Sequence, residues 1–208
     1  MESDRTMSRS FPRRSEETIM LCALLRVLSA HDRETFAHTA RVARLAEATA
    51  YLLGQSAAEQ QLIRLAALLH DIGKLDIPPA LLHKREALTQ DEWALMCRHP
   101  EIGQQLLAQV GGRFQLLAAI VVAHHERWDG QGYPAGLAGE EIPLAARILA
   151  VVDSYDAMIS QRAYHHPCTL GQARAELQQC AGGRYDPCVV EAFLQVLDAQ
   201  EYPSLCQI

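Results

Sequence analysis

The sequence predicts an all-α fold, a single helical domain that carries one long loop. Apolar residues recur three and four positions apart through most of the 208 residues, and no useful stretch alternates with the period of two typical of strands. Hydrophobic residues make up 49% of the chain and aromatic residues only 6%, while Ala and Leu recur throughout. Such a composition supplies a core and favours packed helices over a sandwich or a barrel.

The apolar period predicts eight helices along the chain. They are expected over Thr18–Ala30, His38–Leu53, Glu59–Leu69, Asp91–His99, Phe114–His124, Leu144–Ile159, Leu170–Cys180 and Pro187–Leu197. Ser56 with Glu59, and Thr89 with Glu92, have the spacing of a capping box at a helix start. Gly73 suits the C-terminus of the third helix.

We divide the chain into an arm, one domain and a tail. Residues 1–16 are polar, mixed in charge and without an apolar period, so we expect a mobile arm there. The domain is predicted over residues 17–198, and residues 199–208 form the tail. Within the domain, the loop Arg127–Pro143 holds four glycines and two prolines. Ordered loops of this length in compact domains are usually functional.

Charge and composition exclude several classes of partner. Acidic residues outnumber basic ones by 25 to 19, a formal charge of -6, which argues against general affinity for nucleic acid polymers or anionic membranes. No apolar run approaches the roughly 20 residues that a membrane span needs. The six cysteines form no CxxC pair, as is typical of a reducing compartment. We therefore expect a cytoplasmic protein.

Five histidines and two aspartates share an unusual setting, because they stand within or at the ends of segments that otherwise read as buried. They are His38, His70, Asp71, His99, His124, His125 and Asp153. A buried imidazole or carboxylate is unfavourable unless it is paired or metal-bound. One such histidine would usually be a core residue bonded to backbone, but a shared metal site explains all seven together. The dipeptide His31-Asp32, at a polar helix end, is interpreted as a solvated turn.

The residue types also restrict the metal. Imidazole and carboxylate without thiolate suit iron, manganese, nickel or zinc. Glu34 precedes His38 by four residues, so both side chains can lie on one helix face and Glu34 can add an eighth ligand. Seven or eight ligands are too many for one ion, so we expect two or three. A pair of ions roughly 3.5–4 Å apart is typical of enzymes that attack phosphoesters.

Three motifs together resemble the HD-GYP subgroup of the HD phosphohydrolases. They are His70-Asp71-Ile72-Gly73-Lys74, the run from His124 to Pro134, and Asp153-Ser154-Tyr155-Asp156-Ala157-Met158 with Arg162 and Tyr164 downstream. The resemblance extends from about Thr18 to Leu197. It implies a helical fold, a centre of two or three divalent ions, iron or manganese, and hydrolysis of the bacterial second messenger cyclic di-GMP.

The resemblance also implies a role for each residue of the motifs. The metal ligands would be His38, His70, Asp71, His99, His124, His125 and Asp153, with Glu34 for a third ion. Asp71 and Lys74 would be catalytic: Asp71 would bridge two cations that activate a water, and Lys74 would bind a phosphate oxygen. Arg162 would hold the second phosphate. Tyr133 would contact a guanine or belong to a docking surface, since in related proteins this loop is associated with GGDEF-domain proteins.

The leading hypothesis is hydrolysis of cyclic di-GMP to pGpG, and onward to GMP if a third ion binds at Glu34. Two alternatives stay open, an HD phosphohydrolase for another cyclic dinucleotide or nucleotide, and a non-catalytic adaptor for GGDEF partners. A homodimer also stays open. The sequence departs from the family after Arg162, where residues 163–166 read Ala-Tyr-His-His and lack the usual basic residue. A histidine there would weaken the phosphate contact and make it sensitive to pH.

Overall fold

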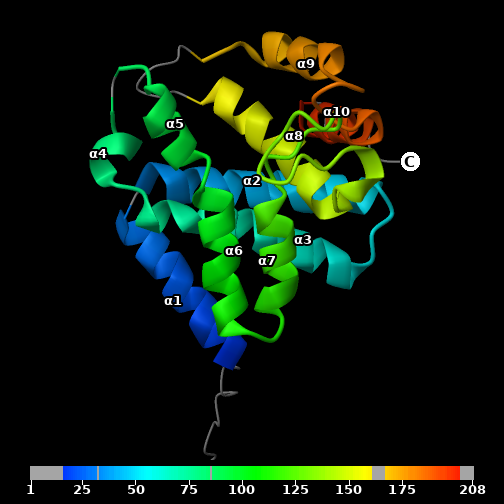
Figure 1. Ribbon diagram of the computed structural model, residues 1–208. Coiled ribbons are helices and arrows are strands. Elements are labelled where there is room, and N and C mark those ends of the chain that lie inside the picture. The colour runs from blue at the N-terminus through cyan, green and yellow to red at the C-terminus, as the bar shows by residue number, and fades with distance from the viewer. Residues whose placement is uncertain (1–15, 32, 85, 161–166, 202–208) are drawn as a thin grey trace, which may run out of the picture.

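The computed structural model describes residues 16–201 apart from residues 32, 85 and 161–166, and this part of the chain is helical without a β-strand (Figure 1). The predicted all-α fold class is therefore confirmed. In chain order the elements are α1 (Glu16–His31), α2 (Arg33–Leu52), α3 (Ala57–Leu69), η1 (Ile72–Asp76), α4 (Pro79–Leu82), α5 (Gln90–Met96), α6 (His99–Val110), α7 (Phe114–Val122), η2 (Gly139–Glu141), α8 (Leu144–Ile159), α9 (Leu170–Gln179) and α10 (Pro187–Glu201).

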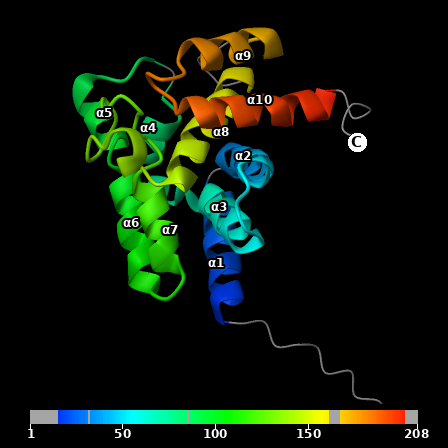
Figure 2. The same ribbon diagram turned by 90° about the vertical axis from the view of Figure 1, so that its right-hand side faces the viewer.

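The long helices surround one apolar core. Figure 2 shows the pair α6 and α7 on one side, α1 to α3 on the other, and α8 to α10 above them. Buried residues of α1, α2, α3, α6, α7, α8, α9 and α10 form a single hydrophobic cluster. Because these helices pack around one core, residues far apart in the sequence become neighbours in the fold.

The predicted start signals act as expected. The Ser56 hydroxyl accepts a hydrogen bond from the Glu59 N–H at 3.3 Å, and the Glu59 carboxylate accepts one from the Ser56 N–H at 2.8 Å. Thr89 and Glu92 form the same reciprocal pair at the start of α5. Each pair satisfies backbone donors that have no partner within the helix. Ser56 and Thr89 are the N-caps, as the capping boxes predict, and the helices begin at Ala57 and Gln90, slightly before the predicted bounds.

The predicted helix Asp91–His99 is wrong at its end, and a further helix was not predicted. α5 stops at Met96, and His99 begins α6, with Pro100 in the first turn of that helix. A proline in the first turn removes no intrahelical hydrogen bond, so it favours a helix start. The predicted helix ending at His124 also stops early, at Val122. Both differences place a histidine at a helix boundary.

Gly73 does not have the expected C-terminal position. α3 ends at Leu69, and Gly73 lies inside η1. A Cβ atom on Gly73 would lie 1.9 Å from the carbonyl oxygen of His99 and 2.6 Å from the backbone nitrogen of Gly103. The missing side chain therefore lets η1 pack directly on α6, which brings the His70-Asp71 pair next to His99.

Some predictions fall on residues outside this description. These are residues 1–15 of the predicted arm, residues 202–208 of the predicted tail, and Arg162 with its neighbours in 161–166. Among the helices that are described, none has the length and apolar character needed to cross a lipid bilayer.

Replacing Gly73 with Ala is expected to lower the free energy of unfolding by about 3 kcal/mol or more, because the added methyl group meets backbone atoms that cannot move aside. Urea unfolding followed by circular dichroism measures the change. Gly171→Ala is the control, since a Cβ atom there meets nothing within 4 Å and Gly171 lies in the first turn of α9, where alanine fits. Equal stability of the two variants would contradict the close contact of η1 with α6.

Candidate metal centre

Five histidine side chains converge from four separate parts of the chain. His38 comes from α2, His70 follows α3, His99 begins α6, and His124 and His125 follow α7. Ring centroids lie 5.5 Å apart for His38 and His70, 5.2 Å for His70 and His124, and 5.0 Å for His99 and His125. The structure thus brings together all five histidines that the sequence singled out.

Their ligand atoms form two groups, each with atoms within 4.8 Å of one another. The groups are His99 with His124 and His125, and His38 with His70 and Asp71. The two oxygens of Asp71 face different groups: Oδ2 lies 3.5 Å from Nε2 of His70, and Oδ1 lies 3.5 Å from Nε2 of His99. One carboxylate therefore stands between two groups that could each hold a cation.

Asp153 of α8 joins the second group. Its Oδ1 atom lies 2.9 Å from Nε2 of His38 and 3.8 Å from Nε2 of His70. Because α8 packs beside α2 in the shared core, a residue 115 positions away in sequence from His38 reaches the same group. With Asp153, the second group has two imidazoles and two carboxylates.

Backbone hydrogen bonds decide which nitrogen of three histidines faces the centre. The Nδ1 atoms of His70, His99 and His124 lie 2.7, 2.9 and 2.5 Å from the carbonyl oxygen three residues earlier in the chain. A carbonyl only accepts, so each Nδ1 carries the proton and each Nε2 keeps its lone pair. Metal-bound histidines are oriented in this way.

This arrangement leaves lone pairs that only a cation or a donor can satisfy. Nε2 of His70 is buried and has no hydrogen-bond partner. Nε2 of His99 and Nε2 of His124 are 3.3 Å apart, and in these tautomers both are acceptors, so they cannot bond to each other. Unsatisfied buried polar atoms are costly, and a metal ion would satisfy these atoms together. The residues present thus fit a metal centre.

A carboxylate behind His38 was missed by the sequence analysis. Nδ1 of His38 lies 2.6 Å from Oδ2 of Asp156, and Arg41 donates to the two oxygens of Asp156 at 2.7 and 2.8 Å. Burial opposes the charged imidazole, but the hydrogen bonds with Asp153 and Asp156 prevail and raise the pKa of His38 to about 9. The available signal was spacing: Arg41 follows His38 by three residues, and Asp156 follows Asp153 by three.

His99, His125 and Asp71 have the protonation that a divalent cation requires. Burial lowers the pKa of His99 to about 4 and that of His125 to about 3, so both rings are neutral near pH 7. Burial opposes ionisation of Asp71, but Lys74 and the nearby imidazoles hold its pKa well below the usual value. The Lys74 ammonium lies 2.7 Å from Oδ2 of Asp71. Neutral imidazoles and ionised carboxylates are the forms that bind metals.

Three other predicted site residues lie at or beyond the edge of this region. The ring of Tyr133 stacks on His125 with centroids 5.0 Å apart. Glu34 belongs to α2 one turn before His38, but its side chain is outside the described part of the chain, as is the whole of Arg162. The buried Glu126, which follows His125 directly, was also missed, because it reads as a polar residue at the start of a loop.

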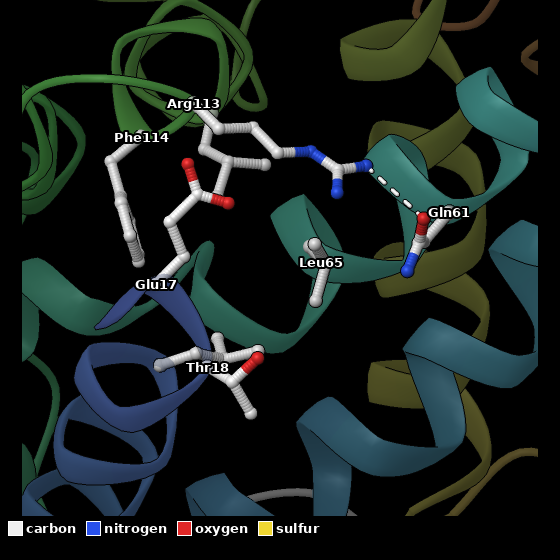
Figure 3. Close-up of a pocket in the computed structure, with 8 residues that line it drawn as sticks. Glu17, Thr18, Gln61, Leu65, Arg113 and Phe114 are labelled. Atoms are coloured by element: carbon white, nitrogen blue, oxygen red, sulfur yellow. Dashed lines mark hydrogen bonds between the residues drawn. The ribbon is translucent and has the colours of Figure 1, made fainter. Parts of the chain in front are cut away.

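A separate cavity of about 100 Å³ lies between α1, α3 and α7. Figure 3 shows Glu17 and Thr18 on one side of it and Arg113 reaching Gln61, to which it donates a hydrogen bond of 3.4 Å. None of the five converging histidines lines this cavity. This cavity is therefore separate from the histidine cluster.

Comparison with known proteins agrees with this geometry. The family model described as HD domain matches residues 23–189, which include the five histidines, Asp71 and Asp153. The chain belongs to the HD domain family. The family resemblance predicted from the three motifs is confirmed.

Two curated relatives are phosphodiesterases of cyclic dinucleotides. The chain is 45% identical over 183 residues to the cyclic di-GMP phosphodiesterase response regulator RpfG of Xanthomonas campestris, covering 88% of this chain and 48% of that protein. It is 41% identical over 176 residues to the 3'3'-cGAMP-specific phosphodiesterase 2 of Vibrio cholerae, covering 84% of this chain and 34% of that protein. The chain thus spans between a third and a half of the length of these relatives.

A solved structure supports the fold. An HDG"Y"P protein from Bdellovibrio bacteriovorus superposes with a TM-score of 0.64 at 23% identity, over 79% of this chain and 52% of that one. At this identity the likeness concerns the arrangement of helices. It agrees with the single helical HD-type domain that the sequence predicts.

Replacing Asp156 with Asn is expected to weaken metal binding at the group containing His38 by roughly 10–100-fold, because the orienting carboxylate becomes a neutral amide. Metal retained per chain after dialysis against graded chelator concentrations measures the effect. The matched control is Asp186→Asn, since Asp186 is also buried and pairs with an arginine, Arg147, at 2.7 Å, but is not among the partners of the histidine cluster. Unchanged metal retention in Asp156→Asn, or equal loss in both variants, would contradict the role of Asp156.

Proposed function

We propose that this domain is a metal-dependent phosphodiesterase that hydrolyses cyclic di-GMP to pGpG. The observation that carries the proposal is the position of Asp71. Its Oδ2 atom lies 3.5 Å from Nε2 of His70 in one group, and its Oδ1 atom lies 3.5 Å from Nε2 of His99 in the other. A carboxylate shared in this way suits two cations at the separation that phosphoester hydrolysis uses. The similarity to two cyclic dinucleotide phosphodiesterases supports the same reaction.

The proposed ligands of the centre are the two described groups with Asp153, and Glu34 for a third ion. Divalent cations held there would lower the pKa of a water molecule and neutralise charge on a phosphate. Asp71 would orient both ions through its two oxygens. The backbone carbonyls that hold Nδ1 of His70, His99 and His124 fix those rings before any metal arrives. Little reorganisation is then needed on binding.

Lys74 places a positively charged side chain beside Asp71. Its ammonium contacts Asp71 and its side chain is 25% exposed, so it can also reach a ligand. We propose that Lys74 donates to a non-bridging phosphate oxygen and stabilises the charge that grows as the phosphorus is attacked. One water is consumed, one P–O3′ bond breaks, and the phosphate stays on the 5′ oxygen, which gives linear pGpG. Arg162 would hold the second phosphate.

Another cyclic dinucleotide is the second candidate substrate. The similarity to a 3'3'-cGAMP-specific phosphodiesterase, at 41% identity, is the specific observation that favours it. The two substrates share the phosphodiester ring that the metal centre would attack and differ in one base. Cyclic di-GMP and 3'3'-cGAMP should therefore be compared in the same assay. The adaptor hypothesis is less well supported, because all seven residues predicted as core ligands are present and near one another.

We further propose iron or manganese as the native metal and a cytoplasmic location. Imidazole and carboxylate ligands without thiolate suit these metals, and the five described cysteines form no disulfide. The proposed catalytic unit is the predicted domain over residues 17–198. GGDEF-domain proteins remain proposed partners of the loop that carries Tyr133, and a homodimer remains open.

Replacing Asp71 with Asn is expected to abolish both metal retention and hydrolysis, because the shared carboxylate loses its charge and one acceptor oxygen. Anaerobically purified protein is assayed by metal analysis and by chromatography of cyclic di-GMP, 3'3'-cGAMP and pGpG. Asp198→Asn serves as the control, since that exposed carboxylate pairs with Arg174 outside the centre. Normal metal content together with normal hydrolysis in the Asp71 variant would overturn the proposed function.

Replacing Glu34 with Ala is expected to stop the conversion of pGpG to GMP while the opening of cyclic di-GMP continues, because only the third ion would depend on this carboxylate. The two steps are followed separately by supplying each substrate in excess. The metal content should fall by one ion per chain. Equal loss of both steps, or GMP formation at the wild-type rate, would contradict a third ion at Glu34.

A further inference from the structure

Glu126 anchors the long loop through its buried carboxylate. Oε1 accepts hydrogen bonds from the backbone N–H groups of Ala135 at 2.7 Å and Gly136 at 3.1 Å, and Oε2 accepts one from Leu137 at 3.1 Å. The residue is only 3% exposed. Three hydrogen bonds from successive backbone amides to one buried carboxyl group fix the loop in one position. These hydrogen bonds involve none of the proposed metal ligands.

The anchored loop folds back onto the backbone beside it. A Cβ atom on Gly132 would lie 2.4 Å from the backbone nitrogen of Arg127, so only glycine allows this approach. The Tyr133 N–H donates to the carbonyl oxygen of His125 at 3.3 Å. The loop is therefore fixed on both sides of Tyr133. Gly132, before it, packs against the backbone of Arg127, and the amides of residues 135–137, after it, donate to the Glu126 carboxyl group.

The consequence for Tyr133 is a fixed ring over a member of the metal centre. Its ring lies nearly parallel to that of His125, at 28° with centroids 5.0 Å apart. Burial raises the pKa of the Tyr133 phenol, and the neighbouring Cys97, which follows α5, adds to the shift. His125 is only partly buried, whereas the other four rings are buried, and Tyr133 covers one face of it.

We propose that Glu126 is a positioning residue that acts through Tyr133: by holding the amides of residues 135–137, it keeps the tyrosine ring on His125 and shields that side of the metal centre. The inference rests on the proposed function, and it adds that the loop controls how readily a bound ion leaves and how well substrate is held. Glu126 belongs to neither group of ligand atoms, and its carboxylate accepts hydrogen bonds from the backbone amides of residues 135–137. Its effect on the bound ion and on the substrate passes through the tyrosine ring.

The chemistry of the anchor explains why a carboxylate is required. Glutamine has the same shape but replaces one acceptor oxygen by an NH₂ donor. A donor facing a backbone N–H leaves a buried group unsatisfied, which is more costly than the bond that was lost. The loop would then leave this position, and the ring of Tyr133 would leave His125 with it.

The test is the rate at which metal-loaded protein releases its ions to an excess of a coloured chelator, together with KM and kcat for cyclic di-GMP. Glu126→Gln is expected to raise the rate of metal release about tenfold. A tenfold change in rate corresponds to the upper end of the net free energy of one hydrogen bond. KM should rise by a similar factor and kcat should change less. Glu141→Gln is the matched control, because Glu141 accepts a bond from Ala138 in the same loop without holding residues 135–137. It should leave release and KM unchanged.

A double-mutant cycle with Tyr133→Ala separates positioning from general loosening. Tyr133→Ala alone should speed metal release as much as Glu126→Gln does, and the double variant should release no faster than either single variant. Additive effects would overturn the inference. If Glu126→Gln fails to fold, Tyr133→Ala still decides, since unchanged release from that variant would overturn the shielding role.

The proposed function and this inference fail separately. Wild-type protein that binds metal but hydrolyses no cyclic dinucleotide would contradict the proposed function and leave the release rates interpretable. Wild-type hydrolysis with equal release from the wild type and Glu126→Gln would contradict only the inference.

Discussion

The metal centre depends on hydrogen bonds between the imidazole Nδ1 atoms and groups behind them. Backbone carbonyls hold Nδ1 of His70, His99 and His124, and the Asp156 carboxylate holds Nδ1 of His38. Every one of these rings therefore turns Nε2 toward the same small volume. The lone pairs of His70, His99 and His124 gathered in this way repel one another unless a cation lies among them. The rest of the domain is the scaffold that holds these rings in position.

A small number of close contacts between secondary-structure elements bring the ligand residues together. Gly73 lets η1 lie directly on α6, and through that contact Asp71 comes within reach of both histidine groups. α8 and α2 share the core, which places Asp153 beside His38. Each contact joins segments far apart in sequence, so the centre forms only when the domain has folded. Metal binding should consequently stabilise the native state.

The sequence predicts the members of the centre better than it predicts their orientation. His38, His70 and His124 could be recognised because a polar side chain in an apolar helix needs a partner. Asp156 left only the signal of its spacing from Asp153 and Glu126 left none, because their partners, Arg41 and the amides of residues 135–137, become neighbours only through the fold. α6 was missed for a local reason: its N-cap residue, Arg98, makes no side-chain cap, so Pro100 lacks the polar capping residue that marks the starts of α3 and α5.

The central claim is that two cations lie on either side of the Asp71 carboxylate. Anomalous X-ray diffraction from anaerobically loaded crystals, collected above and below the iron and manganese absorption edges, tests it most directly. The account predicts two peaks roughly 3.5–4 Å apart, one beside His99, His124 and His125 and the other beside His38 and His70, with a further peak for the third ion proposed at Glu34. A single peak away from Asp71, or fully loaded crystals without any peak among these histidines, would contradict it.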